Sequence, residues 1–129
     1  MGQLSTLYSL KLSHNQLTPK SLDYIKEGFR AGIFINLKIL DLGYNELGDE
    51  GARTISHMFC DATNYFQFIE QINLQENNIS DIGFVKLVKI LVNVKENQAK
   101  ELNYFCLRNN HISGSIRAQY MPIPSYISL

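Results

Sequence analysis

Four asparagines recur at regular spacing in this chain, and the amide of each can both donate and accept hydrogen bonds. They are Asn15, Asn45, Asn77 and Asn110, at successive spacings of 30, 32 and 33 residues. A turn leaves backbone N–H and C=O groups without partners, and an asparagine amide can satisfy one of each. Asparagines at this regular spacing therefore predict a stack of similar turns joined by a structural asparagine ladder.

Each asparagine occupies the ninth place of an eleven-residue phrase that recurs four times. The phrases begin at Leu7, Leu37, Ile69 and Leu102, and apolar residues hold their first, fourth, sixth and eleventh places. Apolar residues at places four and six predict a short strand with one buried face. A repeat period of this size is typical of a solenoid.

The residues after each of the first three phrases predict a helix that leads back to the next strand. Apolar residues recur seven, ten and fourteen positions past the asparagine, which forms one stripe along a helix. They are Leu22, Ile25 and Phe29, then Ala52, Ile55 and Phe59, then Phe84, Leu87 and Leu91. We therefore expect parallel strands near residues 9–12, 39–42, 71–74 and 104–107, with helices near 19–31, 49–61 and 81–95.

The two ends of the chain depart from this pattern. No amphipathic stripe follows Asn110, and Pro122 and Pro124 favour an extended path. We expect a solenoid over residues 1–116 and an extended C-terminal tail over 117–129 that caps the solenoid or binds a partner. The first strand begins close to Met1 and leaves Leu10, Leu12 and Leu22 uncovered, so we expect the N-terminal end to dock on another subunit. A fragment of a longer repeat array would expose the same surface.

These phrases resemble the leucine-rich repeat family. The stretch Leu47-Gly48-Asp49-Glu50-Gly51-Ala52 and the helical returns are most similar to the ribonuclease-inhibitor-like subclass. The period is somewhat longer than that subclass prefers, and asparagine stands where it often has cysteine. The resemblance spans roughly residues 4–116. It implies an α/β solenoid of about four repeats, with a short curved parallel sheet on the concave face, helices on the convex face and other proteins as partners.

Eight residues are candidates for binding a partner on the predicted concave face. In a strand, side chains at places three, five and seven point away from the buried side, and place eight adds the adjoining rim. Tyrosine and arginine often dominate the energetics of protein interfaces, although exposed aromatic residues also simply favour strands. The candidates are Ile39, Asp41, Tyr44, Gln71, Asn73, Glu76, Tyr104 and Arg108.

Composition excludes several classes of partner and location. Twelve basic and twelve acidic side chains cancel, so no global field favours nucleic acid. No apolar run is long enough to span a membrane, and no secretory signal is visible. We therefore expect a cytoplasmic protein, in which Cys60 and Cys106 remain free thiols. Residues 1–6 match the loose pattern for acylation of Gly2, which the sequence does not decide.

The sequence gives little support to catalysis. His14, His57 and His111 fall at unrelated places in the repeat, and none pairs with a nucleophile at a known spacing. No glycine-rich phosphate loop and no metal-ligand spacing occur, so we predict no catalytic residue, cofactor or metal. The sequence favours a non-catalytic protein-protein interaction module, a subunit or scaffold of a larger intracellular assembly. The alternative is a GTPase regulator of the Ran GTPase-activating protein type, which shares the repeat subclass.

Overall fold

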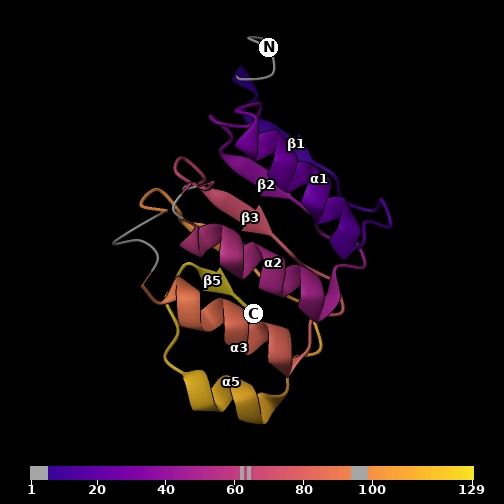
Figure 1. Ribbon diagram of the computed structural model, residues 1–129. Coiled ribbons are helices and arrows are strands. Elements are labelled where there is room, and N and C mark those ends of the chain that lie inside the picture. Colours follow the sequence, from indigo (N-terminus) through magenta and orange to yellow (C-terminus); the bar gives the residue numbers. More distant parts are fainter. Residues whose placement is uncertain (1–5, 62, 64, 94–98) are drawn as a thin grey trace.

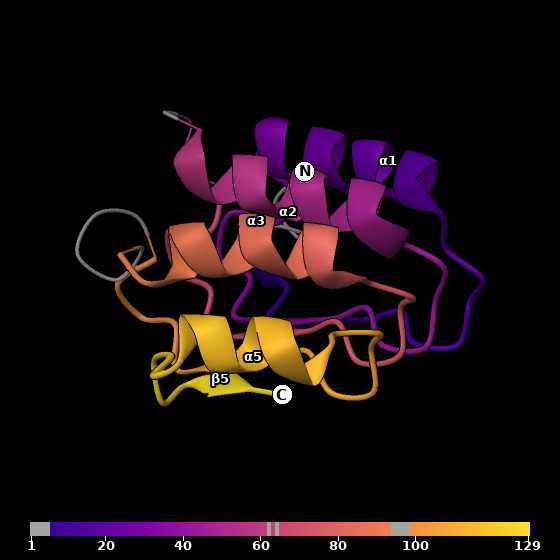
Figure 2. The ribbon, with the colours of Figure 1, turned by 90° about the horizontal axis from the view of Figure 1, so that it is seen from below.

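A parallel sheet with one layer of helices makes up the described part of the chain. The computed structural model describes residues 6–61, 63, 65–93 and 99–129. The strands are β1 (Ser9–Lys11), β2 (Ile39–Asp41), β3 (Gln71–Asn73), β4 (Tyr104–Cys106) and β5 (Ile127–Ser128), all parallel and ordered in the sheet as in the sequence. The helices are α1 (Pro19–Arg30), α2 (Gly48–Cys60), α3 (Asp81–Leu91) and α5 (Gly114–Tyr120). Figures 1 and 2 show these helices side by side along the sheet.

The predicted α/β solenoid is confirmed by the register of the sheet. Leu10 lies opposite Leu40, and the same row continues through Ile72, Phe105 and Ile127. This row points toward the helices, and every member from β2 onward is buried. The strands lie where they were expected, near residues 9–12, 39–42, 71–74 and 104–107, and so do the helices near 19–31 and 49–61. The helix expected near 81–95 is α3, which ends at Leu91; residues 94–95 of that expectation lie outside the described residues.

Hydrogen bonds from Asn45 join the first two repeats. Its Oδ1 accepts the backbone N–H groups of Asn15 and Leu17, each at 2.9 Å. Its Nδ2 donates to the carbonyl of Leu12 at 3.0 Å. One buried amide therefore satisfies three backbone groups of the preceding turn, which is the pairing that the predicted ladder requires.

The later asparagines repeat this arrangement. Asn110 Oδ1 accepts the N–H groups of Asn77 and Ile79, each at 2.9 Å, and Asn110 Nδ2 donates to the Leu74 carbonyl at 2.9 Å. Asn77 bonds Leu47 N–H and the Leu42 carbonyl of the second repeat. Asn15 differs, because it is exposed and its amide donates to the Ser13 carbonyl of its own turn. Each internal asparagine therefore fastens the repeat before it.

A second set of bonds joins the starts of neighbouring helices. Asp49 accepts hydrogen bonds from the backbone N–H groups of Ser80 and Gly83 and from the Ser80 hydroxyl. Asp81 accepts from the N–H and hydroxyl of Ser113 at 2.7 Å each. The carboxylate of one helix thus fixes the capping serine of the next helix. Only the asparagine ladder was foreseen from the sequence.

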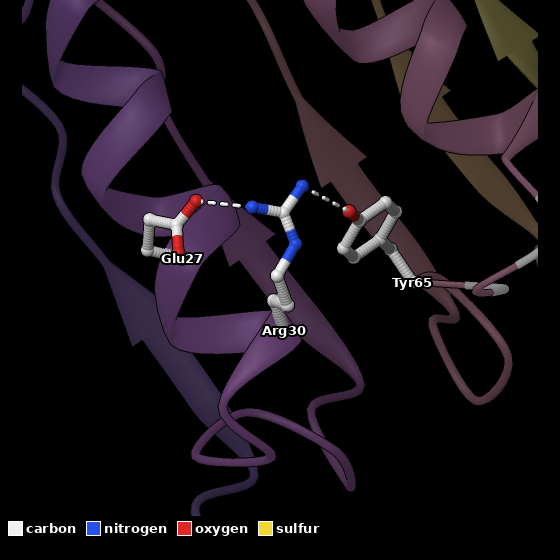
Figure 3. Close-up of polar contacts among 3 residues, drawn as sticks. All are labelled: Glu27, Arg30 and Tyr65. Carbon is white, nitrogen blue, oxygen red and sulfur yellow. Dashed lines mark hydrogen bonds and ion pairs between the residues drawn. The ribbon is translucent and has the colours of Figure 1, made fainter.

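The segment after α2 is tied back to the end of α1 (Figure 3). Arg30 donates one hydrogen bond to the Tyr65 hydroxyl at 3.1 Å and another to Glu27. The hydrogen bond with Tyr65 and the charge of Glu27 hold the pKa of Arg30 above its ordinary value. The Tyr65 ring packs edge-on against Phe29, with ring centroids 6.3 Å apart. This contact holds in place a return segment that differs in length between repeats.

The expectation of an extended path from residue 117 was wrong for its first four residues. Helix α5 runs across that boundary, because Ser113 caps it by accepting the N–H of Ile116. Tyr120 then packs edge-on against Phe84 of α3, with ring centroids 6.1 Å apart. Seven residues are too few for the long stripe that marks the earlier helices, which is why the sequence pattern missed this helix.

The remaining tail adds β5 to the sheet beside β4. The N–H of Phe105 donates to the Tyr126 carbonyl at 2.9 Å, and Leu107 donates to Ser128 at 2.7 Å. The Tyr126 hydroxyl donates to the carbonyl of Leu91 at the end of α3, and burial raises the pKa of Tyr126 to about 12. Residues 127–129 thus repeat the alternation of places four to six, which is a signal that sequence reasoning overlooked.

Leu22 and the two cysteines lie in different surroundings. Leu22 was expected to lie uncovered at the N-terminal end, but it is fully buried because α2 packs beside it at Gly51. Cys60 and Cys106 are both free thiols, as predicted. None of the helices in the described segments has the length and apolar character needed to cross a membrane.

Replacing Asn45 with alanine should lower the free energy of unfolding by about 1–3 kcal/mol, because buried backbone groups lose their partners. The matched control is Asn15→Ala, which removes the same amide from an exposed turn and should cost less than about 0.5 kcal/mol. Urea titrations of both variants measure the difference. Equal transition midpoints would contradict the inter-repeat role of the ladder.

Candidate binding surface on the open sheet face

The face of the sheet opposite the helices carries the candidate residues, and we call it the open face. Ile39, Gln71 and Tyr104 are register partners across β2, β3 and β4. Asp41 and Asn73 are partners in the next row. These side chains surround a hollow, whose lining consists of Lys11, Ile39, Leu40, Asp41, Gln71, Asn73 and Tyr104.

Polar side chains that are hydrogen-bonded to one another and to the backbone occupy the centre of the open face. Asp41 Oδ1 accepts the Gly43 N–H and the Asn73 Nδ2–H, each at 3.0 Å. Asn73 Oδ1 in turn accepts the N–H of Gln75 at 2.9 Å. A Cβ at residue 43 would lie 3.0 Å from Asn73 Nδ2, so glycine permits this close approach. The arrangement presents carboxylate and amide groups whose positions are set before any partner arrives.

Exposed groups with apolar area flank this polar centre. The Tyr104 side chain is 38% exposed, and Ile39 is half-buried at the other side of the exposed Gln71. Hydrogen bonding with the Cys106 thiol and partial burial raise the pKa of Tyr104. Tyr104 therefore stays neutral at physiological pH and offers both a ring face and a hydroxyl donor.

Tyr44 stands on the rim in a fixed orientation. Its ring stacks on His14, with centroids 4.3 Å apart and planes 13° from parallel. Its hydroxyl accepts a hydrogen bond from Gln75 Nε2 at 3.2 Å. Tyr44 is 43% exposed, so a partner can contact the exposed part of its side chain. Because the ring is already held in one orientation, such a contact costs little side-chain conformational entropy.

The rim residues share an unusual backbone conformation. Tyr44 has a φ of 56°, and the corresponding His14, Glu76 and Asn109 have φ between 53° and 60°. A non-glycine residue in this left-handed region costs roughly 1–2 kcal/mol. The asparagine that follows Tyr44, Glu76 or Asn109 bonds the preceding turn, which holds the strained conformation in place.

None of the eight predicted residues belongs to the hydrophobic core. Glu76 and Arg108 are exposed in adjacent turns, where the Glu76 N–H donates to the Arg108 carbonyl at 3.1 Å. The structure therefore brings the eight residues onto the open face and its rim, and their role in binding stays a prediction. Sequence reasoning missed the support of Tyr44 by His14 and Gln75, because places seven and eight become neighbours only when repeats stack.

One place-five residue does not share the exposure of its row. Cys106 occupies the same place as Asp41 and Asn73, yet it is 1% exposed. The reason is β5, which puts Ser128 beside Cys106 in the sheet. The added strand thus converts an expected surface position into a covered one.

The family comparison matches the first half of this architecture. Residues 3–26 and 35–56 match the family model described as Leucine Rich repeat. Together with the parallel sheet and its row of helices, this match shows the fold of a leucine-rich repeat solenoid. The structure continues the same unit of strand, turn and helix through two further repeats, each with its own asparagine. No curated protein matches the chain.

Replacing Tyr44 with glycine should leave the leucine-rich repeat fold more stable than replacing it with alanine. Both changes remove the ring, but only glycine adopts a φ of 56° without a Cβ penalty. We expect a difference of about 1 kcal/mol in the free energy of unfolding, measured in urea. The same two substitutions at Ile39, a strand position, provide the control. There alanine should be the more stable variant, and the same order at both positions would contradict the backbone argument.

Proposed function

We propose that this protein is a non-catalytic protein-protein interaction module that holds a partner protein on its open face. The observation that carries the proposal is the alignment of Ile39, Gln71 and Tyr104 in one register row beside the immobilised ring of Tyr44. Solenoids of stacked repeats use such extended sheet surfaces for binding. Ordered aromatic side chains contribute large contact area at little cost in conformational entropy.

The size of the open face supports a role within a larger assembly. Parallel strands are spaced about 4.8 Å apart, so five of them span only about 19 Å. A strip of this width supplies part of a standard interface, which buries about 800 Å² per partner. We infer a subunit or scaffold of an intracellular assembly, and the two free thiols favour a reducing compartment such as the cytoplasm.

The helical returns of 11 to 13 residues favour the ribonuclease-inhibitor-like subclass.

The apolar N-terminal end supports contact with another subunit. Leu10, Leu12, Ile25 and Phe34 line a hollow between β1 and α1, and Tyr24 at its edge is 70% exposed. Strand β1 pairs with β2 on one side, and the described residues place no strand on its other side. We propose that a second protein chain packs its own apolar surface on this end. Such a contact would cover both the hollow and the strand edge.

The C-terminal segment has the opposite role in this proposal. Residues 117–129 act as the C-terminal cap of the solenoid. Strand β5 and the bond from Tyr126 to the Leu91 carbonyl support this role, because they place the segment across the last repeat. The two ends therefore differ, with one covered by the chain itself and the other offered to a partner.

Replacing Tyr44 or Tyr104 with alanine should weaken partner binding by at least about 1 kcal/mol, because each ring supplies exposed contact area on the open face. The measurement is titration calorimetry with a partner obtained by affinity capture. Lys20→Ala, on the outer side of α1, is the control and should leave the affinity unchanged. Dependence on Lys20 with both tyrosines silent would show that the partner binds elsewhere.

The isolated chain should self-associate at tens of micromolar when examined by sedimentation velocity, because association buries the apolar surface of its N-terminal end. Tyr24→Lys should shift the distribution toward monomer, since it places a charge at the edge of the hollow. Tyr104→Lys adds the same charge on the open face and should leave association unchanged. A clean monomer in the unsubstituted chain would contradict docking through this end.

A further inference from the structure

The outer side of α3 is apolar where the neighbouring helix is polar. Ile82 is 65% exposed, and Val92 at the other end of the helix is 50% exposed. Counted from the asparagine of each repeat, the corresponding places on α2 hold Glu50 and Cys60. Burial of these two apolar side chains against a partner would remove apolar area from water, which favours association.

Three exposed residues and the half-buried Val85 form one line along the helix. Ile82, Val85, Lys89 and Val92 follow one another at steps of three, four and three residues. Side chains at this spacing lie on one side of an α-helix and form the seam on which a second helix packs. At 1.5 Å per residue the line is about 15 Å long, which matches about three turns of a partner helix.

The exposed charged side chains of α3 along this seam are both basic. Lys86 and Lys89 are exposed along it, and the adjacent α5 adds Arg117. The only carboxylate in α3 and α5 is Asp81, which already accepts two hydrogen bonds from Ser113. The neighbouring α2 carries one exposed charge of each sign in its first two turns, Glu50 and Arg53. The surface therefore complements an acidic partner.

We propose that α3 is a docking site for an amphipathic helix with acidic side chains, contributed by a partner protein. The apolar side chains of that helix pack on Ile82, Val85 and Val92, and its carboxylates face Lys86 and Lys89. The site lies on the helix layer, whereas the open face lies on the other side of the sheet (Figure 2). The module can therefore hold two partners at once, and this second site does not rest on the function proposed for the open face.

The test uses two synthetic three-heptad peptides with leucine at the seam positions, one flanked by glutamates and the other by lysines. Fluorescence anisotropy measures the binding of each labelled peptide to the full chain. The acidic peptide should bind at least about tenfold more tightly than the basic one, and its affinity should fall as salt is added. Equal affinity for the two peptides would overturn the proposal.

Substitutions then locate the site. Lys89→Glu should weaken the acidic peptide at least about tenfold, and Ile82→Ser should weaken both peptides. Lys20→Glu makes the same charge change on the exposed side of α1 and is the matched control. The double variant of Lys86→Glu with Lys89→Glu should reverse the preference and favour the basic peptide. An equal loss in the Lys20 variant, or a loss on Tyr104→Ala, would place the peptide elsewhere and overturn the proposal.

Discussion

The structure depends on one constraint, which is that the backbone groups of every turn need hydrogen-bond partners although the turns are packed against each other. The amide of each internal asparagine meets this need for the preceding repeat, as Asn45 does for Asn15 and Leu17. Asn45 also donates to the Leu42 and Gly43 carbonyls of its own turn, so one amide serves two neighbouring repeats. The repeats therefore stabilise one another in a chain of nearest-neighbour contacts, which is the behaviour expected of a solenoid.

The same constraint shapes the candidate binding surface. Fixing the asparagine fixes the residue before it in the left-handed region, where Tyr44 has a φ of 56°. The strained backbone projects the Tyr44 ring onto the rim, and His14 and Gln75 from the neighbouring repeats hold it there. Stability and recognition are thus coupled, because the bonds that stack the turns also orient the side chains offered to a partner.

The helix layer and the sheet play different physical parts. The helices are joined at their starts by bonds such as Asp49 to Ser80, while the sheet is joined by its ladder of backbone bonds. Both layers keep a rigid spacing between repeats. Polar side chains on the open face are already paired with one another, as Asp41 is with Asn73, whereas the outer line of α3 keeps Ile82 exposed. Two chemically distinct surfaces therefore lie on opposite sides of one rigid scaffold.

The sequence by itself determined the repeat, its strands, its first three helices and the side of the sheet on which the candidate residues lie. These follow from periodicity, since apolar alternation and the helical stripe depend only on local geometry. Tertiary structure alone decided the rest. The C-terminal segment, whose prolines indicated an extended path, forms α5 and β5. Both elements are too short to give a recognisable sequence pattern, and tertiary contacts such as that of Tyr120 with Phe84 stabilise them. Tertiary structure also buried Cys106, because exposure depends on which strand lies beside it.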